Sequence, residues 1–142
     1  LAADDGGVTA DYQRADVVLV GVSRSGKTPT CIYMAMQYGV FAANYPFTEE
    51  DFEGKQLPAM LRPHTAKMFG LTISPQRLQQ IRNERRPGSR YATLAQCEFE
   101  VRCAEALFNR YSVPCLDTTE CSIEEIASRV IDRMGIERRL RP

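Results

Sequence analysis

Apolar residues follow two periods along the chain, one typical of buried strands and the other of amphipathic helices. Residues 17–20 are an unbroken run of β-branched and aliphatic side chains between Asp16 and Gly21. An apolar run without alternation is typical of a strand that is buried on both faces, as in a parallel sheet. We therefore predict a buried strand at 17–20.

Four segments carry the helical period or signals that begin a helix. The predicted helices are residues 28–37, 75–81, 93–111 and 123–134. Ser74 before Pro75 is typical of an N-cap followed by the first helical position. Ser122 and Glu125 have the spacing of a capping box, which fixes the start of the last helix.

Three further apolar segments, residues 40–44, 68–73 and 113–116, are predicted strands. Strands that alternate with helices favour an α/β fold in layers, with helices around a mostly parallel sheet. These elements occupy residues 15–142, which we predict to be one domain.

Residues 1–14 are polar and contain glycine, so we predict a linker or tail outside that domain. Leu1 is not a start methionine, and Asp4 and Asp5 make the opening acidic, unlike a signal peptide. We expect a cut end, so that this chain is one piece of a longer protein.

The segment at 21–28 fits the phosphate-binding pattern G-x-x-x-x-G-K-[ST] between a predicted strand and a predicted helix. The predicted phosphate-binding residues are Gly21, Val22, Ser23, Arg24, Ser25, Gly26, Lys27 and Thr28. Its glycines allow backbone N–H groups to wrap a phosphate, and Lys27 supplies a mobile charge from an exposed position. The Thr28 hydroxyl is a candidate Mg²⁺ ligand, and Arg24 either reaches a second phosphate or faces solvent. This context predicts a three-layer P-loop kinase-like domain.

Charge and composition narrow the function classes. The 18 basic and 18 acidic residues cancel, so there is no excess positive field for duplex nucleic acid, which we do not expect as a partner. No apolar run approaches the roughly 20 residues of a membrane span, so we expect no membrane protein. The five cysteines lack a C-x-x-C pair and have one histidine beside them, which favours buried thiols in a reducing cytoplasm.

Four arginines, Arg82, Arg85, Arg86 and Arg90, gather before the long helix. Such a cluster resembles the lid of a small kinase, which closes over phosphates and excludes water. A solvated basic face and a docking surface for a partner are the alternatives. Arg86 and Arg90 join Lys27 as candidate catalytic residues.

A phosphate-binding loop is often complemented by an acid at a strand end, which helps to hold Mg²⁺. Asp117 follows the predicted strand at 113–116 and is our candidate metal ligand, while Asp51 with Glu49 and Glu50 forms another acidic group. His64 has no carboxylate or cysteine at ligand spacing, so we interpret it as a loop histidine.

The loop and its surroundings resemble a known family. Residues 15–30, with the string Gly-Val-Ser-Arg-x-x-Lys-Thr-Pro-Thr from Gly21, and residues 42–47, 69–73 and 89–92 carry the similarity. The family is that of the phosphoenolpyruvate synthase regulatory proteins, also called pyruvate, water dikinase regulatory proteins. The similarity covers nearly the whole chain. The resemblance implies a further N-terminal domain, missing here, to which the predicted tail at 1–14 would connect.

This resemblance implies a bifunctional enzyme with ADP, Mg²⁺ and inorganic phosphate as cofactors or substrates. Its serine/threonine kinase activity would use ADP to phosphorylate a threonine of phosphoenolpyruvate synthase and inactivate it. Its pyrophosphorylase activity would use phosphate to remove that group and release pyrophosphate. The family's ADP-binding loop carries over onto residues 21–28. The implied location is cytoplasmic, and the oligomeric state stays open, a homodimer included.

Three alternatives remain open from the sequence. The sister branch regulates pyruvate, phosphate dikinase, although the Ser25-Gly26 pair and residues 44–47 look more like the synthase branch. A small-molecule P-loop kinase shares the loop, an arginine lid and this length. A nucleotide-binding regulatory module would bind without turnover.

Overall fold

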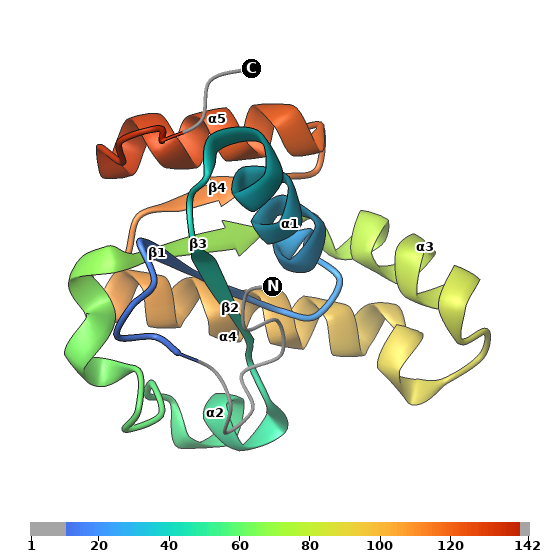
Figure 1. The fold of residues 1–142 in the computed structure, drawn as a ribbon. Helices are drawn as coiled ribbons and strands as arrows, with labels where there is room; N and C mark the ends of the chain where they lie inside the picture. The colour runs from blue at the N-terminus through green and yellow to red at the C-terminus, as the bar shows by residue number, and fades with distance from the viewer. Residues whose placement is uncertain (1–10, 140–142) are drawn as a thin grey trace.

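A four-stranded parallel sheet forms the centre of the protein. The computed structural model describes residues 11–139, and the strands follow the order β2-β1-β3-β4 (Figure 1). They are β1 (Val17–Gly21), β2 (Ala42–Pro46), β3 (Met68–Thr72) and β4 (Cys115–Asp117). All three pairings are parallel, which confirms the predicted α/β fold.

Helices cover both faces of this sheet and complete three layers (Figure 1). α1 (Lys27–Tyr38) and α5 (Ile123–Met134) pack on one face against Val17 and Leu19. α3 (Pro75–Arg85) and α4 (Leu94–Arg110) lie on the other side, where α4 packs against Val18 and Val20. Alternate residues of β1 therefore serve two cores, which is why its apolar run is unbroken.

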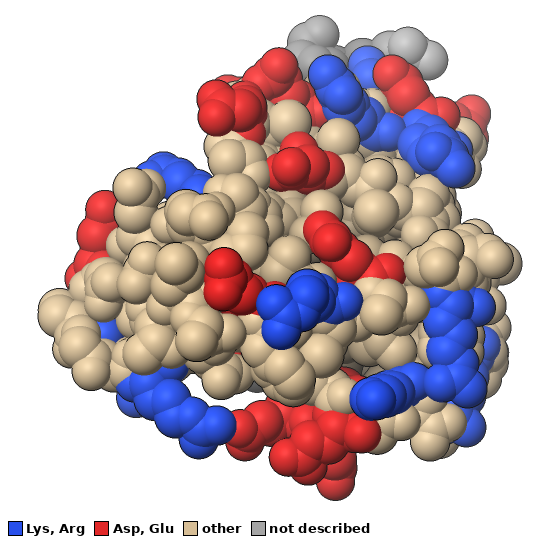
Figure 2. Space-filling view, turned by 180° about the vertical axis from the view of Figure 1, so that it is seen from behind, with Lys and Arg blue, Asp and Glu red and all other residues tan. Residues whose placement is uncertain are grey.

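The surface carries charges of both signs. Figure 2 shows basic and acidic side chains spread among uncharged residues on one face, in keeping with the formal net charge of zero. Within residues 11–139, no helix is both long and apolar enough to cross a membrane. Cys31 and Cys97 are buried as predicted, whereas Cys115 on the edge strand β4 is exposed.

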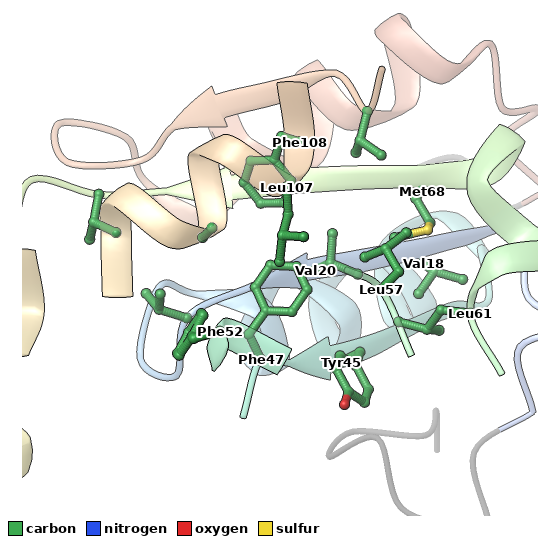
Figure 3. Close-up of a cluster of buried hydrophobic side chains, with 14 of the residues drawn as sticks. Val18, Val20, Tyr45, Phe47, Phe52, Leu57, Leu61, Met68, Leu107 and Phe108 are labelled. Carbon is green, nitrogen blue, oxygen red and sulfur yellow. The ribbon is translucent and has the colours of Figure 1, made fainter. Parts of the chain in front are cut away.

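Aromatic side chains fill the core between the sheet and α4 (Figure 3). The Phe47 ring lies 6.0 Å from the Phe52 ring and 5.9 Å from the Phe108 ring, measured between centroids. Gly70 in β3 makes room for Phe108, because a Cβ at Gly70 would come within 2.6 Å of that ring. The core thereby fixes the segment that follows β2 beside the end of β1.

Element boundaries differ from the predicted ones at the sheet ends. β2 lies at 42–46 instead of 40–44, because Gly39 ends α1 in the left-handed conformation and the Asp16 carboxylate accepts from Phe41 N at 2.8 Å. β3 ends at Thr72, one residue earlier than predicted, and β4 lies at 115–117 instead of 113–116. The pairing of neighbouring strands decides where each strand ends.

Three short elements have no counterpart in the sequence prediction. They are α2 (Glu49–Gly54), η1 (Arg62–Lys67) and η2 (Arg90–Ala92). α2 is held by a capping box in which Thr48 accepts from Asp51 N and Asp51 accepts from Thr48 N. Elements of six residues or fewer are too short to show the repeated spacing of apolar residues from which a helix is predicted.

The packed domain begins before residue 15. Tyr12, which we assigned to the tail, is only 6% exposed and belongs to the core on the α4 side. Lys67 donates to the carbonyl oxygens of Gln13 and Ala15 and so holds this segment. Residues 1–10 of the predicted tail lie outside the described residues.

Candidate phosphate-binding site

The loop at residues 21–28 joins the end of β1 to the start of α1, as the motif requires. Gly21 lies against β3, where a Cβ would come within 2.4 Å of the Leu71 carbonyl oxygen. Gly26 has a φ of 102°, and Arg24 has a φ of 72°, which is costly for a side chain that is not glycine. The loop is thus held in a conformation that most sequences would not adopt.

The first turn of α1 supplies the physical basis for anion binding. α1 begins at Lys27, directly after the left-handed Gly26. The unpaired N–H groups and positive dipole end of a helix N-terminus favour a phosphate there. No acidic residue lies in this first turn, so no side chain of the turn opposes an anion.

Lys27 is buried, in contrast to the exposed position that we predicted. The residue is 4% exposed, and its Nζ donates to the Val22 carbonyl oxygen and to Ser25 Oγ. Burial, together with the charges of Arg82 and Arg24, lowers the pKa of Lys27 to about 7. The lysine therefore packs inside the loop, and an arriving phosphate would favour its charged form.

A cavity of about 450 Å³ opens over the loop. It is lined by loop residues, Lys27 and Thr28 among them, and by Asn44, Ile81 and Tyr91 from other elements. Its size lies in the range of small-molecule ligand pockets, which is roughly 300–1,000 Å³.

Arg82 is a buried residue that holds the loop through hydrogen bonds, and it is not a lid residue. Its side chain is fully buried and donates to Glu100 Oε1 at 2.8 Å and to the Tyr91 carbonyl oxygen at 2.9 Å. It also donates to the Ser23 carbonyl oxygen and Oγ, both at 3.3 Å. The predicted cluster of arginines is therefore split, because Arg82 points inward while Arg85 is exposed.

Tyr91 connects this buried arginine to the loop. Its ring lies 4.0 Å from the Arg82 guanidinium carbon, and its hydroxyl lies 2.6 Å from Ser23 Oγ. Ser23 and Tyr91 also line a second cavity, of about 290 Å³, beside the first. The pair thus forms a wall between two cavities.

The two candidate catalytic arginines lie next to Tyr91. The Arg86 guanidinium is 5.7 Å from the centre of the Tyr91 ring. Arg90 lines the second cavity and donates to Glu49 Oε1 at 3.5 Å. Neither is among the lining residues of the loop cavity, so contact with a phosphate there would require movement of both side chains.

The candidate metal ligands lie in different places. Thr28 lines the loop cavity, where Asn44 Nδ2 donates to Thr28 Oγ1 at 3.4 Å. The buried Asn44 Oδ1 has no hydrogen-bond partner among residues 11–139. Asp117 lines another cavity with Ser74 and Glu105, and its carboxylate accepts from Thr119. The structure thus brings Asn44, and not Asp117, to Thr28.

The other candidate acids and the histidine are engaged elsewhere. Asp51 is 7% exposed and accepts from Tyr45 Oη at 2.8 Å in addition to capping α2. His64 lies in η1 with its ring 6.4 Å from that of Tyr12. Among residues 11–139, no three His, Cys, Asp or Glu side chains gather as a metal site.

Sequence reasoning missed two residues that hold the site, Thr118 and Asn44, and gave a third, Arg82, the role of a lid residue. Thr118 donates to the Ser25 carbonyl oxygen at 3.1 Å and so ties the loop to the end of β4, while Asn44 and Arg82 act as described above. Asn44 could have been found, because it is the last residue of the strand predicted at 40–44, and polar residues at the ends of neighbouring parallel strands meet at one sheet edge. Thr118 carries no comparable signal, and nothing near Arg82 in the sequence distinguishes this buried arginine from its exposed neighbours.

Comparison with known proteins identifies the family of this chain. The family model described as kinase/pyrophosphorylase matches residues 1–131. Proteins named as phosphoenolpyruvate synthase regulatory proteins are 58% identical in Pseudomonas savastanoi pv. phaseolicola and 59% identical in Pseudomonas fluorescens. Each alignment covers 99% of this chain and 52% of the relative, so the chain spans about half the length of these relatives. The chain belongs to the kinase/pyrophosphorylase family.

Proposed function

We propose that this chain is the nucleotide-binding part of an enzyme that regulates phosphoenolpyruvate synthase in two directions. One direction transfers the β-phosphoryl group of ADP to a threonine of the synthase and leaves AMP. The other joins inorganic phosphate to that phosphoryl group, which restores the threonine and releases pyrophosphate. The observation that carries the proposal is the loop at 21–28, with the buried Lys27 and the start of α1 facing one cavity.

Both directions use two adjacent phosphate groups, which supports a single site. ADP brings an α,β pair, and phosphorolysis joins an incoming phosphate to the departing phosphoryl group. Phosphoryl transfer depends mainly on alignment and on neutralisation of charge, so the same positive groups serve either direction. Lys27 and Arg24 both line the loop cavity, and the charges of Arg82 and Arg24 help to lower the pKa of Lys27.

The kinase step balances without a further reactant. The threonine oxygen bonds to the β-phosphorus while the bond from that phosphorus to the bridging oxygen breaks. AMP leaves with the electron pair of that bond, and the hydroxyl proton passes to solvent. Lys27 and the loop N–H groups neutralise the phosphate oxygens throughout. Because β is the transferred group, the ADP must lie in a register shifted from that of an ordinary ATP-dependent kinase.

Mg²⁺ fits the residues beside the loop. Thr28 Oγ1 and the unpartnered Asn44 Oδ1 are neutral oxygen donors of the kind that this ion binds directly or through water. When bound, the ion would neutralise phosphate charge. Thr28 and Asn44 would hold it, and Asp117 is left out of this proposal because of its place in another cavity.

The identity of the protein substrate is supported by the relatives. Both of the relatives described above are named for the synthase, not for pyruvate, phosphate dikinase. A cytoplasmic location would follow from such a substrate. We therefore propose the synthase as partner.

The test is a transfer assay with ADP that carries a radiolabel in its β-phosphate, purified synthase and the protein at its relatives' full length. We expect label on a threonine, and its release as pyrophosphate after addition of phosphate. Lys27→Met should abolish both, whereas Lys67→Met, outside the loop, should abolish neither. Transfer only from ATP to a small molecule would favour a metabolite kinase, and binding without transfer would favour a regulatory module.

A further inference from the structure

A second cavity lies directly beside the loop cavity and takes no part in the nucleotide binding proposed above. It has a volume of about 290 Å³ and shares Ser23 and Tyr91 with the loop cavity. The hydroxyl groups of these two residues are 2.6 Å apart. Of the residues that the structure describes, this hydrogen-bonded pair alone is common to both linings, so a group in the second cavity lies next to the phosphate-binding loop.

The second cavity has an apolar floor and a polar mouth. Phe47 and Phe52, which are 6% and 3% exposed, form the floor. Glu49 and Arg90 lie at the mouth, since their side chains are largely exposed and 3.5 Å apart. The remaining carboxylate, Glu100, is already paired with Arg82 and accepts from Gln96, so it is not free to bind a ligand.

Its size and lining suit a peptide segment better than a second nucleotide. A volume of about 290 Å³ is at the lower end for small-molecule pockets. Lys27 and Thr28, the loop residues with phosphate-binding chemistry, line the other cavity, and Arg90 at the mouth of this one is paired with Glu49. A short side chain with a hydroxyl group, followed by an apolar neighbour, matches both the wall of hydroxyls and the aromatic floor.

We propose that this cavity is the acceptor subsite, which takes the hydroxyl-bearing residue of the protein segment that receives the phosphoryl group. This inference rests on the proposed function and adds the place where the protein substrate binds. An acceptor oxygen must come within about 3 to 3.5 Å of the reacting phosphorus. The hydroxyls of Ser23 and Tyr91 can each donate and accept, so they can exchange their mutual bond for bonds to the acceptor and to a phosphate oxygen. At the mouth, Glu49 accepts hydrogen bonds from backbone N–H groups of the segment.

The test compares two neighbouring glutamates in the first turn of α2. Both Glu49 and Glu50 are exposed, but only Glu49 lines the cavity, so Glu50→Arg is a matched control for Glu49→Arg. Each substitution is made in the protein at the full length of its relatives. The measurements are the KM for synthase, the KM for phosphorylated synthase in the reverse direction, and the dissociation constant for ADP by calorimetry.

We expect Glu49→Arg to raise both KM values by about tenfold, a change of about 1.4 kcal/mol in binding, with the ADP dissociation constant unchanged within about twofold. Glu50→Arg should change none of them by more than about twofold. An equal loss of ADP affinity in Glu49→Arg would make the cavity part of the nucleotide site and overturn the proposal. Equal effects of the two substitutions, or no effect of either, would also overturn it.

The same assay distinguishes a failure of the proposed subsite from a failure of the proposed function on which it rests. If the unsubstituted protein binds ADP but transfers nothing to the synthase, the proposed function itself is wrong and the subsite falls with it. If transfer occurs and Glu49→Arg leaves both KM values unchanged, the function stands and only the subsite is wrong.

Discussion

Arg82 Nη2 donates to Glu100 Oε1 at 2.8 Å, and the two side chains are 0% and 12% exposed. This pair joins α3 to α4, and the same guanidinium donates to Ser23 in the phosphate-binding loop. A single buried ion pair therefore couples the packing of two helices to the position of the loop. Removal of this pair should therefore affect both the packing of the two helices and the position of the loop.

Replacement of Arg82 by methionine should lower the free energy of unfolding by about 3–5 kcal/mol, because it leaves the buried Glu100 carboxylate without its partner. Arg85→Met, at an exposed position of the same helix, should change it by less than about 0.5 kcal/mol. Urea denaturation measures both. If the double variant Arg82→Met/Glu100→Met is no more stable than Arg82→Met, the unpaired carboxylate is not the cause.

Lys27→Met should abolish ADP binding without unfolding the domain. The substitution removes a charge that is buried among loop atoms, so the ligand-free protein should be as stable as the original or more stable at pH 6. Calorimetry with ADP and thermal denaturation test the two parts. Loss of the folded state at pH 6 would show that Lys27 is needed for the loop to form.

The affinity for ADP should fall as the pH rises above 7. The pKa of Lys27 is about 7 in the free protein, and a bound phosphate raises it, so binding at pH 8 takes up a proton. Calorimetry at pH 8 in buffers of different ionisation enthalpy measures this uptake. The guanidinium of Lys27→Arg stays charged, so this variant should take up no proton if it binds ADP. If it takes up as many protons as the original protein, the proton belongs to another group.

The same pKa sets how this lysine affects stability. Its ordinary value is 10.5, so the unfolded chain binds more protons than the folded one between about pH 7 and 10.5. The contribution of Lys27 to stability should therefore rise with pH across that window. We therefore expect the free energy of unfolding of Lys27→Met minus that of the original protein, measured by urea titration, to fall from pH 7 to pH 10. A constant difference would contradict the lowered pKa.

Gly21→Ala should destabilise the domain by about 1–3 kcal/mol and weaken ADP binding. The new Cβ would meet the Leu71 carbonyl oxygen at 2.4 Å, and both groups are backbone-anchored, so β1 and β3 must move apart at the loop. Gly54→Ala is the matched control, because nothing lies within 4 Å of the position that its Cβ would take. Similar denaturation midpoints for the two variants would show that the close approach carries no strain.

Arg86→Ala and Arg90→Ala should each slow turnover by about tenfold while the ADP dissociation constant changes less, as expected for contacts that form mainly in the transition state. Arg85→Ala, on the exposed side of α3, is the control. Steady-state kinetics and calorimetry supply the comparison. Unchanged rates in both variants would make these arginines a solvated basic face.

The sequence by itself determined the architecture and the chemistry of the loop. The unbroken apolar run at 17–20 predicted a buried central strand, and the capping residues Ser74 and Ser122 marked helix starts that the structure confirms. The spacing of Gly21, Gly26 and Lys27 predicted a loop between strand and helix. These features are local, because each depends on residues within a few positions of one another.

Only the tertiary structure decided which residues surround that loop. Arg82 and Lys27 are charged, and the sequence favoured exposed positions for both, yet both are buried. The partners of Arg82 include Ser23 and Glu100, which are distant in the chain, whereas the Lys27 ammonium donates to Val22 and Ser25 inside the loop. Asn44 lies beside Thr28 because β2 pairs with β1, whereas Asp117 at the end of β4 is separated from β1 by β3. Burial and strand order depend on contacts between segments far apart in the sequence, which periodicity and spacing do not record.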